Sequence, residues 1–577
     1  MIRRAGAALA ALCVLAGLAA VPSHASPFAL RVILNIYFGA ALATAWSLLG
    51  GLAGYWSFGS SAFLGLGAFA AALMQEHGGI DDSLERFVVS VVAGGVASGA
   101  LAAVIGYPIL RLRGAYFSIA MLGVSLVLGE LSNSVDLFEG ALGVTLDPGT
   151  NLAPEVLFYY LFLGLAALAL GVAVMVRYSR LGYGLIAIRE DEDTARMLGV
   201  PTERYKLIGF VLSAVLIGLT GAVYAYSLGY ITTSWVFRSD LSFNVVVYSL
   251  LGGMGTLIGP TLGAAVMTVL NDVVLGGLLQ VHMMLTGLVI IALVFLAPNG
   301  VVGLFRRRRK PLSLALSEAP AMPVGQAPPV EPGEPILKFV GLVRAFRGLR
   351  AIDGVDLAIA PGSITTIIGP NGAGKSTLFN MATGYLAPTE GEIWYEGRRI
   401  DGTPTYRINR AGMARVFQIA KPFHGLSVYE NVLVGALFGC EGARDPRKVT
   451  EEALAFTQLS PLAGEVASSL PVGHLRRLEF ARALATRPRL ILADEPCAGL
   501  NRVETAQMMA MLQAARRRGA TVVLVEHDME TVMKISDKVF VIAAGRLIAE
   551  GAPADIVHCP AVIEAYLGKP LERLDTP

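Results

Sequence analysis

The chain has 577 residues, of which 54% are hydrophobic and 16% charged, and its mean hydropathy is +0.60. Soluble proteins of this length are far less apolar, so the composition excludes a wholly soluble enzyme or binding protein and predicts a membrane protein. The net charge of +2 gives no reason to expect a nucleic-acid partner, and the four scattered cysteines have neither disulfide-scaffold nor metal-site spacing.

Ten apolar runs follow one another in the first half, each near the roughly 20 residues that a helix needs to cross a bilayer. They cover about residues 5–22, 29–49, 58–75, 87–107, 115–133, 156–176, 207–228, 242–257, 258–276 and 283–297. We therefore expect a polytopic α-helical membrane domain of about ten spans in residues 1–300. The first run has an alternative, because its basic start and Ser23-His24-Ala25 also fit a cleaved secretory signal.

Alternate threading of these runs collects the basic residues on one side of the membrane, which is the cytoplasmic side by the positive-inside rule. These residues are Arg3, Arg4, Arg111, Arg113, Arg177, Arg180, Arg189 and the run at 306–310. The second half of the chain then lies in the cytoplasm. Acidic residues fall in the opposite loops, where solvated surface and a partner-docking surface are both open: Asp81, Asp82, Glu85, Asp136, Glu139, Asp147 and Glu155.

Some residues interrupt the apolar runs. Gly54, Ser57 and Gly59 interrupt the helical backbone between two spans. Irregular backbone of this kind is expected either along a solute path or where small residues let helices pack closely. Polar groups at membrane depth are costly and often functional, although solvation at the span ends explains them equally here. They are Glu130, Asn271 and Asp272.

The cytoplasmic loop from Arg177 to Lys206 is long for this half and predicts a short charged helix that stops at Gly199 and Pro201. It is either a solvated loop or a coupling helix that binds a groove on the cytoplasmic half of the chain.

Three stretches carry a resemblance to a known permease family: GLAGYWSFGSSAFLGLGAFAAA, IREDEDTARMLGVPTERYKLIGFVLSA and LLGGMGTLIGPTLGA. Over about residues 30–300 the chain resembles the permease of high-affinity branched-chain amino-acid ABC importers. The resemblance implies import of a solute delivered by an extracytoplasmic binding protein. It leaves the solute open, since similar permeases serve urea, short amides and aromatic acids.

A basic, Pro-rich stretch at 301–335 predicts a tether without a core of its own. Beyond it, ITTIIG at 364–369 leads into GPNGAGKST at 369–377, the strand, loop and helix order of a phosphate-binding loop. Backbone N–H groups of such a loop form an anion nest at a helix N-terminus. We expect Lys375 to reach the β- and γ-phosphates and Ser376 to ligate Mg²⁺. The other expected nucleotide-binding residues of this loop are Gly369, Asn371, Gly372, Gly374 and Thr377.

Two later strands are expected to complete the site. LILADEP at 490–496 delivers Asp494 to the metal and Glu495, the expected general base, to the attacking water. VVLVEHD at 522–528 ends with His527, which the order of motifs predicts to contact the γ-phosphate.

The order of these motifs, with RVFQ, LPVGHLRRLEFARAL and AGLN, resembles the ABC ATPase family over about residues 336–568. The resemblance implies an α/β P-loop domain in which Phe346 stacks on adenine and Gln418 joins the Mg²⁺ site to the coupling helix. It also implies that Gly473 caps ATP held by a partner ATPase and that Asn501 lies at the seam between two ATPases. Residues 569–577 are expected to form a tail.

The signature region departs from the family pattern, because Pro471 stands where a small, usually hydroxyl-bearing residue is expected. Proline is tolerated in a first helical turn, yet it offers phosphate neither a hydroxyl nor an N–H. Two interpretations stay open: a weaker composite ATP site at this signature, or a neutral variant.

We expect ATP-driven import of a small polar solute, with branched-chain amino acids as the first candidate, across a bacterial cytoplasmic (inner) membrane. The chain supplies one membrane domain and one ATPase, so partners are expected: a second permease and second ATPase, or a second copy, and a binding protein. The alternatives are import of urea, amides or aromatic acids, an exporter half-transporter, and an ATP-dependent membrane regulator. Ten compact spans disfavour the exporter, which is typically built from six long ones.

Overall fold

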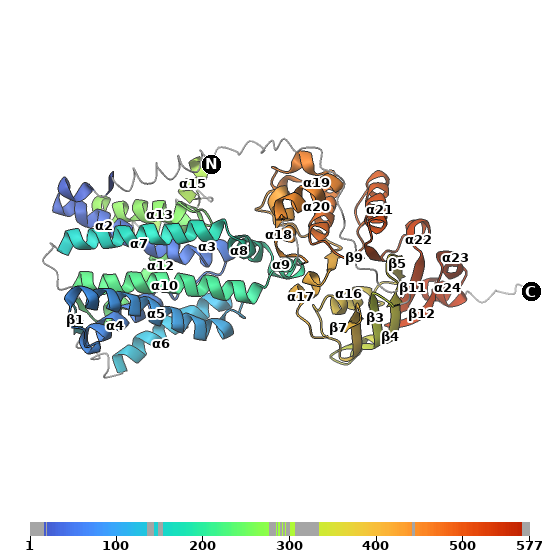
Figure 1. The fold of residues 1–577 in the computed structure, drawn as a ribbon, viewed down its shortest axis with the longest axis horizontal. Coiled ribbons are helices and arrows are strands. Elements are labelled where there is room, and N and C mark those ends of the chain that lie inside the picture. The colour runs from blue at the N-terminus through green and yellow to red at the C-terminus, as the bar shows by residue number, and fades with distance from the viewer. Residues whose placement is uncertain are drawn as a thin grey trace, which may run out of the picture. The chain divides into compact units, whose positions relative to one another are not determined.

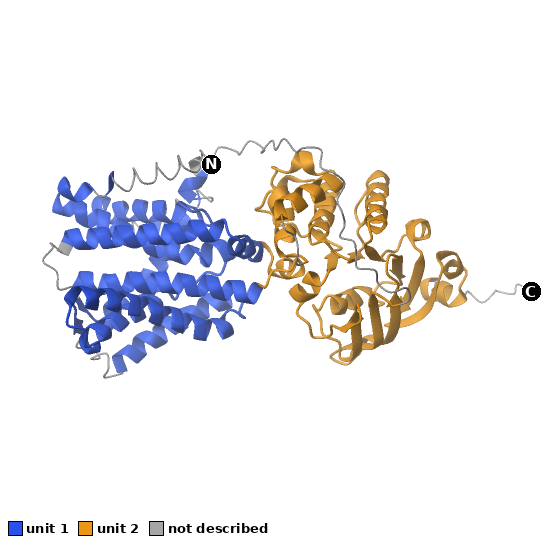
Figure 2. Cartoon of the chain, in the orientation of Figure 1, with its two compact units in different colours: residues 1–189, 202–308 blue, residues 190–201, 309–577 orange. Residues whose placement is uncertain are grey.

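The computed structural model describes residues 20–134, 143–147, 154–275, 300–305, 334–440 and 445–567, with a few isolated positions besides. The chain forms two compact units (Figure 2), residues 1–189 with 202–308 and residues 190–201 with 309–577. Residues 190–201 therefore belong to the unit that contains the expected ATPase, although in sequence they lie between membrane helices. Most of the predicted linker and all of the predicted tail fall outside the described residues, so the predicted boundaries at 300, 335 and 568 stay predictions.

The first unit is built mainly from long apolar helices (Figure 1). They are α2 (Pro27–Ser47), α4 (Ser60–His77), α5 (Ser83–Ile109), α6 (Ala115–Ser134), α7 (Pro154–Arg177), α10 (Thr202–Leu228), α12 (Ser239–Gly253), α13 (Gly259–Thr268) and the π-helical turn η4 (Val269–Val274). Shorter elements are η1 (Val21–Ser23), α3 (Gly50–Ala53), α8 (Arg180–Glu190), α11 (Thr233–Val236), α15 (Gly300–Phe305) and the antiparallel pair β1 (Val144–Thr145) and β2 (Tyr230–Ile231).

Helices lie in eight of the ten predicted runs, and most of the first and last runs fall outside the described residues. Within the described part of the chain, five helical segments are long and apolar enough to cross a membrane: 27–53, 83–109, 115–134, 155–177 and 202–228. The predicted count of about ten spans is therefore not confirmed.

Small residues allow α4, α5 and α10 to pack closely. A Cβ added to Gly67 of α4 would lie 2.3 Å from the carbonyl oxygen of Gly218 in α10, so only glycine fits at this contact. The predicted break between spans is present, since Gly54 adopts φ +75° at the end of α3. Its irregular backbone is satisfied by protein, because the indole nitrogen of buried Trp46 donates to the Ser57 carbonyl at 2.8 Å.

The second unit contains two sheets. The larger has the order β12-β11-β5-β10-β9-β8, parallel except for β12, and the smaller is antiparallel with the order β4-β3-β6-β7. The strands are β3 (Leu337–Phe346), β4 (Leu349–Ile359), β5 (Ile364–Ile368), β6 (Glu390–Tyr395), β7 (Arg398–Arg399), β8 (Met413–Val416), β9 (Leu490–Asp494), β10 (Thr521–Val525), β11 (Lys538–Ala543) and β12 (Arg546–Gly551).

Ten α-helices of the described second unit accompany these sheets (Figure 1). They are α9 (Glu192–Met197), α16 (Lys375–Ala382), α17 (Thr405–Arg410), α18 (Val428–Phe438), α19 (Pro446–Phe456), α20 (Val472–Ala485), α21 (Arg502–Arg517), α22 (Met529–Ile535) and the pair α23 (Pro553–Val557) and α24 (Pro560–Leu567), which together close the C-terminal end. Two short 3-10 turns, η5 (Ser460–Leu462) and η6 (Ala467–Ser469), precede α20.

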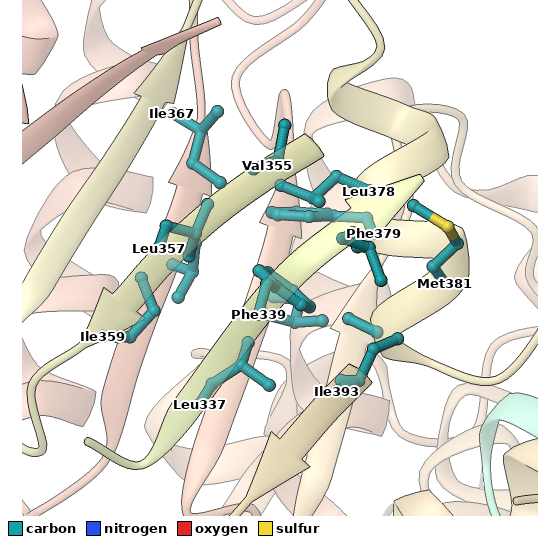
Figure 3. Close-up of a cluster of buried hydrophobic side chains, with 14 of the residues drawn as sticks. Leu337, Phe339, Val355, Leu357, Ile359, Ile367, Leu378, Phe379, Met381 and Ile393 are labelled. Atoms are coloured by element: carbon teal, nitrogen blue, oxygen red, sulfur yellow. The ribbon is translucent and has the colours of Figure 1, made fainter. Parts of the chain in front are cut away.

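One hydrophobic core joins the two sheets to α16, as Figure 3 shows. Phe339 of β3, Leu357 of β4 and Ile367 of β5 are buried together with Leu378 and Phe379 of α16. The five residues of β5 are all buried, as expected for a parallel strand covered on both faces. This packing fixes the end of β5 and the start of α16, between which the phosphate-binding loop runs.

Candidate functional site

The loop between β5 and α16 has the backbone of an anion-binding turn. Gly374 adopts φ +102°, and a Cβ there would lie 2.5 Å from the Ala351 carbonyl oxygen, so a side chain is excluded. The exposed residues Asn371, Gly372 and Ser376 leave the rim of the loop open to a ligand, while Gly369 is buried and Thr377 half-buried.

Lys375 begins α16 and is largely buried. Its ammonium group donates to the carbonyl oxygens of Gly369 (2.7 Å) and Pro370 (3.1 Å). Burial lowers the pKa of Lys375, while the carboxylates of Glu495 and Asp494 act to raise it. Lys375 is thus held at the loop near Asp494 and Glu495, the two acidic residues that the sequence predicts for the same site.

Asp494 ends the buried strand β9 and forms an ion pair with Arg415 of β8, at 3.0 Å between its Oδ2 and the guanidinium. Arg415 also donates to the side chain of Asn380 in α16. Burial raises the pKa of Asp494, and Arg415 opposes that shift. The other carboxylate oxygen, Oδ1, is buried and has no hydrogen-bond partner among the described residues. That oxygen is available to a cation.

Glu495 follows directly and adopts φ +44°, an uncommon conformation for a residue with a side chain. Its backbone N–H donates to the Val525 carbonyl of β10 at 3.0 Å, which anchors the turn. Its carboxylate accepts a 2.7 Å hydrogen bond from the exposed amide of Gln418. The structure therefore brings two of the three predicted catalytic residues into contact.

His527 lies just beyond β10 and is exposed. The next residue, Asp528, caps α22 by accepting hydrogen bonds from the backbone N–H and hydroxyl of Thr531. The preceding residue, Glu526, is buried and accepts from the backbone N–H of Cys497 at 3.4 Å, and burial raises its pKa.

Phe346 ends β3 and has 39% of its surface exposed. The guanidinium of Arg344 lies over its ring, 4.6 Å from the centroid. The ring is therefore held from one side and presents a flat aromatic surface.

The signature helix α20 begins one residue after Pro471, which is extended (φ −68°, ψ 162°) and provides no side-chain cap. A Cβ on Gly473 would lie 2.1 Å from Oε1 of Glu504, which forms a reciprocal capping box with Asn501 at the start of α21. Gly473 and Asn501 therefore share Glu504 as a neighbour, while their role at an ATP bound by a partner stays a prediction.

Two buried arginines that contact the site or the turns beside it do not follow from the motifs. Arg415 is part of RVFQ, and its signal in the sequence is an arginine within MARV, the strand β8, whose four residues are all buried. Arg476 in α20 is 6% exposed, and its guanidinium donates to the carbonyl oxygens of Phe417 and Ala498, each at 3.0 Å. It thus ties the signature helix to the residue before Gln418 and to the turn after Glu495.

Residues 190–201 pack within the second unit. The backbone N–H of Gly425 donates to the carboxylate of Glu190 at 2.9 Å, and Arg410 donates to the Gly199 carbonyl at 3.1 Å. Gly199 adopts φ +87°, and a Cβ there would lie 2.3 Å from the carbonyl oxygen of Phe438. The predicted charged helix is present as α9, and it ends where Gly199 was expected to stop it.

Comparisons with known proteins cover both units. The family described as "Branched-chain amino acid transport system / permease component" matches residues 28–294. "ABC transporter" matches 352–498, and "Branched-chain amino acid ATP-binding cassette transporter" matches 546–571.

Individual relatives match the second unit. The chain is 40% identical over 251 residues to the high-affinity branched-chain amino acid transport ATP-binding protein BraF of Pseudomonas aeruginosa, covering 41% of this chain and 98% of BraF. It is 39% identical over 252 residues to LivG of Escherichia coli, described in the same words, covering 41% of this chain and 99% of LivG. A crystal structure of a nucleotide-free ATP-binding cassette from an ABC transporter is 31% identical and covers 41% of this chain and all of that one, with a TM-score of 0.38. The match of residues 28–294 to the permease family and the identity to BraF and LivG show that the chain belongs to the branched-chain amino-acid ABC transporter family, with a permease domain fused to its ATP-binding cassette.

Proposed function

We propose that this chain uses ATP to import branched-chain amino acids across a bacterial inner membrane. The observation that carries the proposal is the packing of residues 190–201, which interrupt the membrane helices in sequence, into the ATPase unit. This segment follows α8 and leads into α10, so movement of the ATPase reaches the membrane helices through covalent connection. The match of residues 28–294 to the permease family supports the direction and the cargo.

The chain binds ATP and couples its hydrolysis to transport, as its family does. In the proposed site, Phe346 stacks on adenine, while Lys375 and the N–H groups of the loop hold the phosphates. His527 would contact the γ-phosphate. Gly473 would cap ATP held by the partner ATPase, where the N-terminus of α20 favours negative charge.

The free Oδ1 of Asp494 and the exposed hydroxyl of Ser376 support a Mg²⁺ site, with the Gln418 amide oxygen as a further ligand. The ion would neutralise charge on the bound phosphates. Glu495 is the proposed general base. Its hydrogen bond to Gln418 orients the carboxylate before ATP binds and links it to the segment that contacts Glu190 through Gly425.

A complete transporter of this family contains partner subunits and works with a substrate-binding protein. For this chain we propose a second permease, a second ATPase and an extracytoplasmic binding protein as partners. A dimer of two identical chains is the alternative, and one experiment below separates the two.

The proposal is tested with the purified complex in lipid vesicles, by measuring uptake of labelled leucine, isoleucine and valine with and without the binding protein. Glu495→Gln is expected to lower ATP hydrolysis and uptake by at least about 100-fold, because a general base contributes roughly 10²- to 10⁴-fold. Glu530→Gln is the matched control, since Glu530 is an exposed acid that pairs with Lys534 on α22. Uptake of urea or an aromatic acid in place of these amino acids would overturn the cargo, and hydrolysis indifferent to any binding protein would overturn import.

A further inference from the structure

The membrane domain contains a partly open cavity of about 190 Å³ that is lined by residues of α2, α10, α12, α13 and η4. At roughly 30 Å³ for each water molecule it has room for about six, which suits a small solute. Its lining combines amides and a carboxylate with aromatic and aliphatic side chains. The polar members include Asn35, Asn244, Asn271 and Asp272.

The cavity lies toward the extracytoplasmic ends of these helices. Helix α10 starts at Thr202, directly after the segment that belongs to the cytoplasmic ATPase unit. Tyr224, which lines the cavity, lies 22 residues further along α10, a rise of roughly 33 Å. That rise spans the apolar core of a bilayer, so the cavity faces the side on which a binding protein delivers solute.

Among the described residues of the lining, the only acid is Asp272, which lies in the π-helical turn η4 with Asn271. A side-chain N–H of Asn35 in α2 donates to Asp272 Oδ2 at 3.0 Å. An ionisable residue in a membrane domain costs free energy and often marks a functional site. π-helical turns inside helices are also frequent at functional sites. Such a turn carries Asp272 to the cavity.

Aromatic rings complete the lining. Phe38 and Tyr224 stack with their centroids 4.6 Å apart, and Tyr248 packs against α2 where Gly39 leaves room, since a Cβ on Gly39 would lie 3.0 Å from its ring. A carboxylate beside aromatic faces and amide oxygens attracts a cation. Among the described residues that line the cavity there is no lysine or arginine, so no basic side chain of the lining competes for Asp272.

We propose that this cavity receives the solute from outside and that Asp272 binds the ammonium group of a neutral amino acid. Leu42, Leu241 and Val245 line the same cavity and accept the aliphatic side chain. This inference rests on the proposed function, whose cargo carries both an ammonium group and a branched aliphatic chain.

The first test does not depend on the cargo. Asn244→Cys is introduced into the full chain, and intact spheroplasts expressing the complex are treated with membrane-impermeant methanethiosulfonates that carry either an ammonium or a sulfonate group. The parent chain without this substitution is the blank. We expect the cationic reagent to label Cys at this position at least about fivefold faster, because Asp272 attracts it. The preference should fall on adding Asp272→Asn and persist on adding Glu155→Gln, an exposed acid at the start of α7. Absence of labelling from outside, or an unchanged preference with Asp272→Asn, would overturn the inference.

The second test measures leucine uptake by the reconstituted complex. Asp272→Asn is expected to lower uptake at least about tenfold, while Asp272→Glu retains most of it and Glu155→Gln leaves it unchanged. If Asp272→Asn does not assemble, the labelling of Asn244→Cys in the otherwise unchanged chain still tests the inference, and equal rates for the two reagents would overturn it. A wild-type complex that imports no branched-chain amino acid refutes the proposed function alone, whereas normal leucine uptake by Asp272→Asn refutes the assignment of Asp272.

Discussion

At the scale of single residues, Arg476 is the clearest positioning group outside the motifs. Its two hydrogen bonds, to Phe417 and Ala498, join the signature helix to the segments that carry Gln418 and Glu495. The guanidinium is planar and reaches both carbonyl groups at once, which a lysine ammonium on a flexible stem does not reproduce. We therefore expect Arg476 to act by positioning the segments that carry Gln418 and Glu495.

We predict that Arg476→Ala lowers the kcat of ATP hydrolysis about 10- to 100-fold, because a hydrogen bond to a charged group contributes roughly 1.5–3 kcal/mol. ATP binding at Lys375 should change much less, and Arg476→Lys should rescue only part of the loss. Arg477→Ala is the control, since the neighbouring arginine contacts Gln458 and Gln507 at the surface. Equal effects of the two alanine variants on kcat would show that the contacts of Arg476 have no special role.

The site residues that could be predicted are those that a short sequence motif identifies. Lys375, Asp494 and Glu495 each follow from one strand and the turn after it, and the structure brings them together. Arg415 contacts Asp494, 79 residues away, and Arg476 contacts Phe417 and Ala498, 59 and 22 residues away, so no local pattern reports them. The close approach of Glu504 to Gly473 cannot be predicted from the sequence for the same reason.

At the scale of elements, the apolar runs located helices but not their ends. The runs at 242–257 and 258–276 were expected as two full spans, whereas α12 and α13 are shorter. Gly253 (φ +120°) and Gly255 (φ +73°) turn the chain between them, and the π-helical turn η4 replaces the end of the second run. A hydropathy pattern records burial of side chains and carries no information on such changes in backbone hydrogen bonding.

Helix α22, which follows His527, depends on its cap. Hydrogen bonds from Thr531 lower the pKa of Asp528 below its ordinary value of 3.8. The folded state therefore favours the charged form, so the stabilisation is complete above about pH 3.8 and is lost as the pH falls through the lower pKa of the folded state. We predict that Asp528→Ala weakens the protection of Met529–Ile535 in hydrogen exchange by about 1 kcal/mol at pH 7.

This difference between wild type and Asp528→Ala should shrink as the pH is lowered below 3.8. Asp528→Asn, which keeps a capping oxygen that does not titrate, should protect α22 nearly as well as wild type at pH 7 and show no such pH dependence. A difference between wild type and Asp528→Ala that is constant with pH would contradict the role of the charged cap.

At the scale of the whole molecule, transport requires that hydrolysis move the membrane helices, and Gly199 lies where residues 190–201 pack into the ATPase unit. Gly199→Ala forces a side chain into φ +87° and against the Phe438 carbonyl. We predict that it lowers leucine uptake at least about tenfold while ATP hydrolysis persists. Gly519→Ala is the control, because Gly519 has φ +96° in the same unit with no atom within 4 Å of an added Cβ. Parallel loss of hydrolysis and uptake in Gly199→Ala would show a folding defect instead of uncoupling.

Pro471 bears on how many kinds of ATP site the assembly contains. In a heteromeric complex, we expect Glu495 to serve the site at this chain's phosphate loop, and Gly473 and Pro471 to serve the site at the partner's loop. Glu495→Gln should then abolish most hydrolysis, and Gly473→Asp should cost less, because the capless helix N-terminus at Pro471 serves the weaker site. Pro471→Ser supplies the missing capping hydroxyl and should raise the residual hydrolysis of the Glu495→Gln complex severalfold.

In a dimer of identical chains, each site would contain Glu495 of one chain and Gly473 of the other, so each single variant would damage both sites. Equal losses from Glu495→Gln and Gly473→Asp would therefore refute the asymmetry and favour two copies of this chain. Unequal losses, together with a gain from Pro471→Ser only in the Glu495→Gln background, require a second ATPase with its own general base. The same ATPase assay thus tests the role of Pro471 and the composition of the transporter.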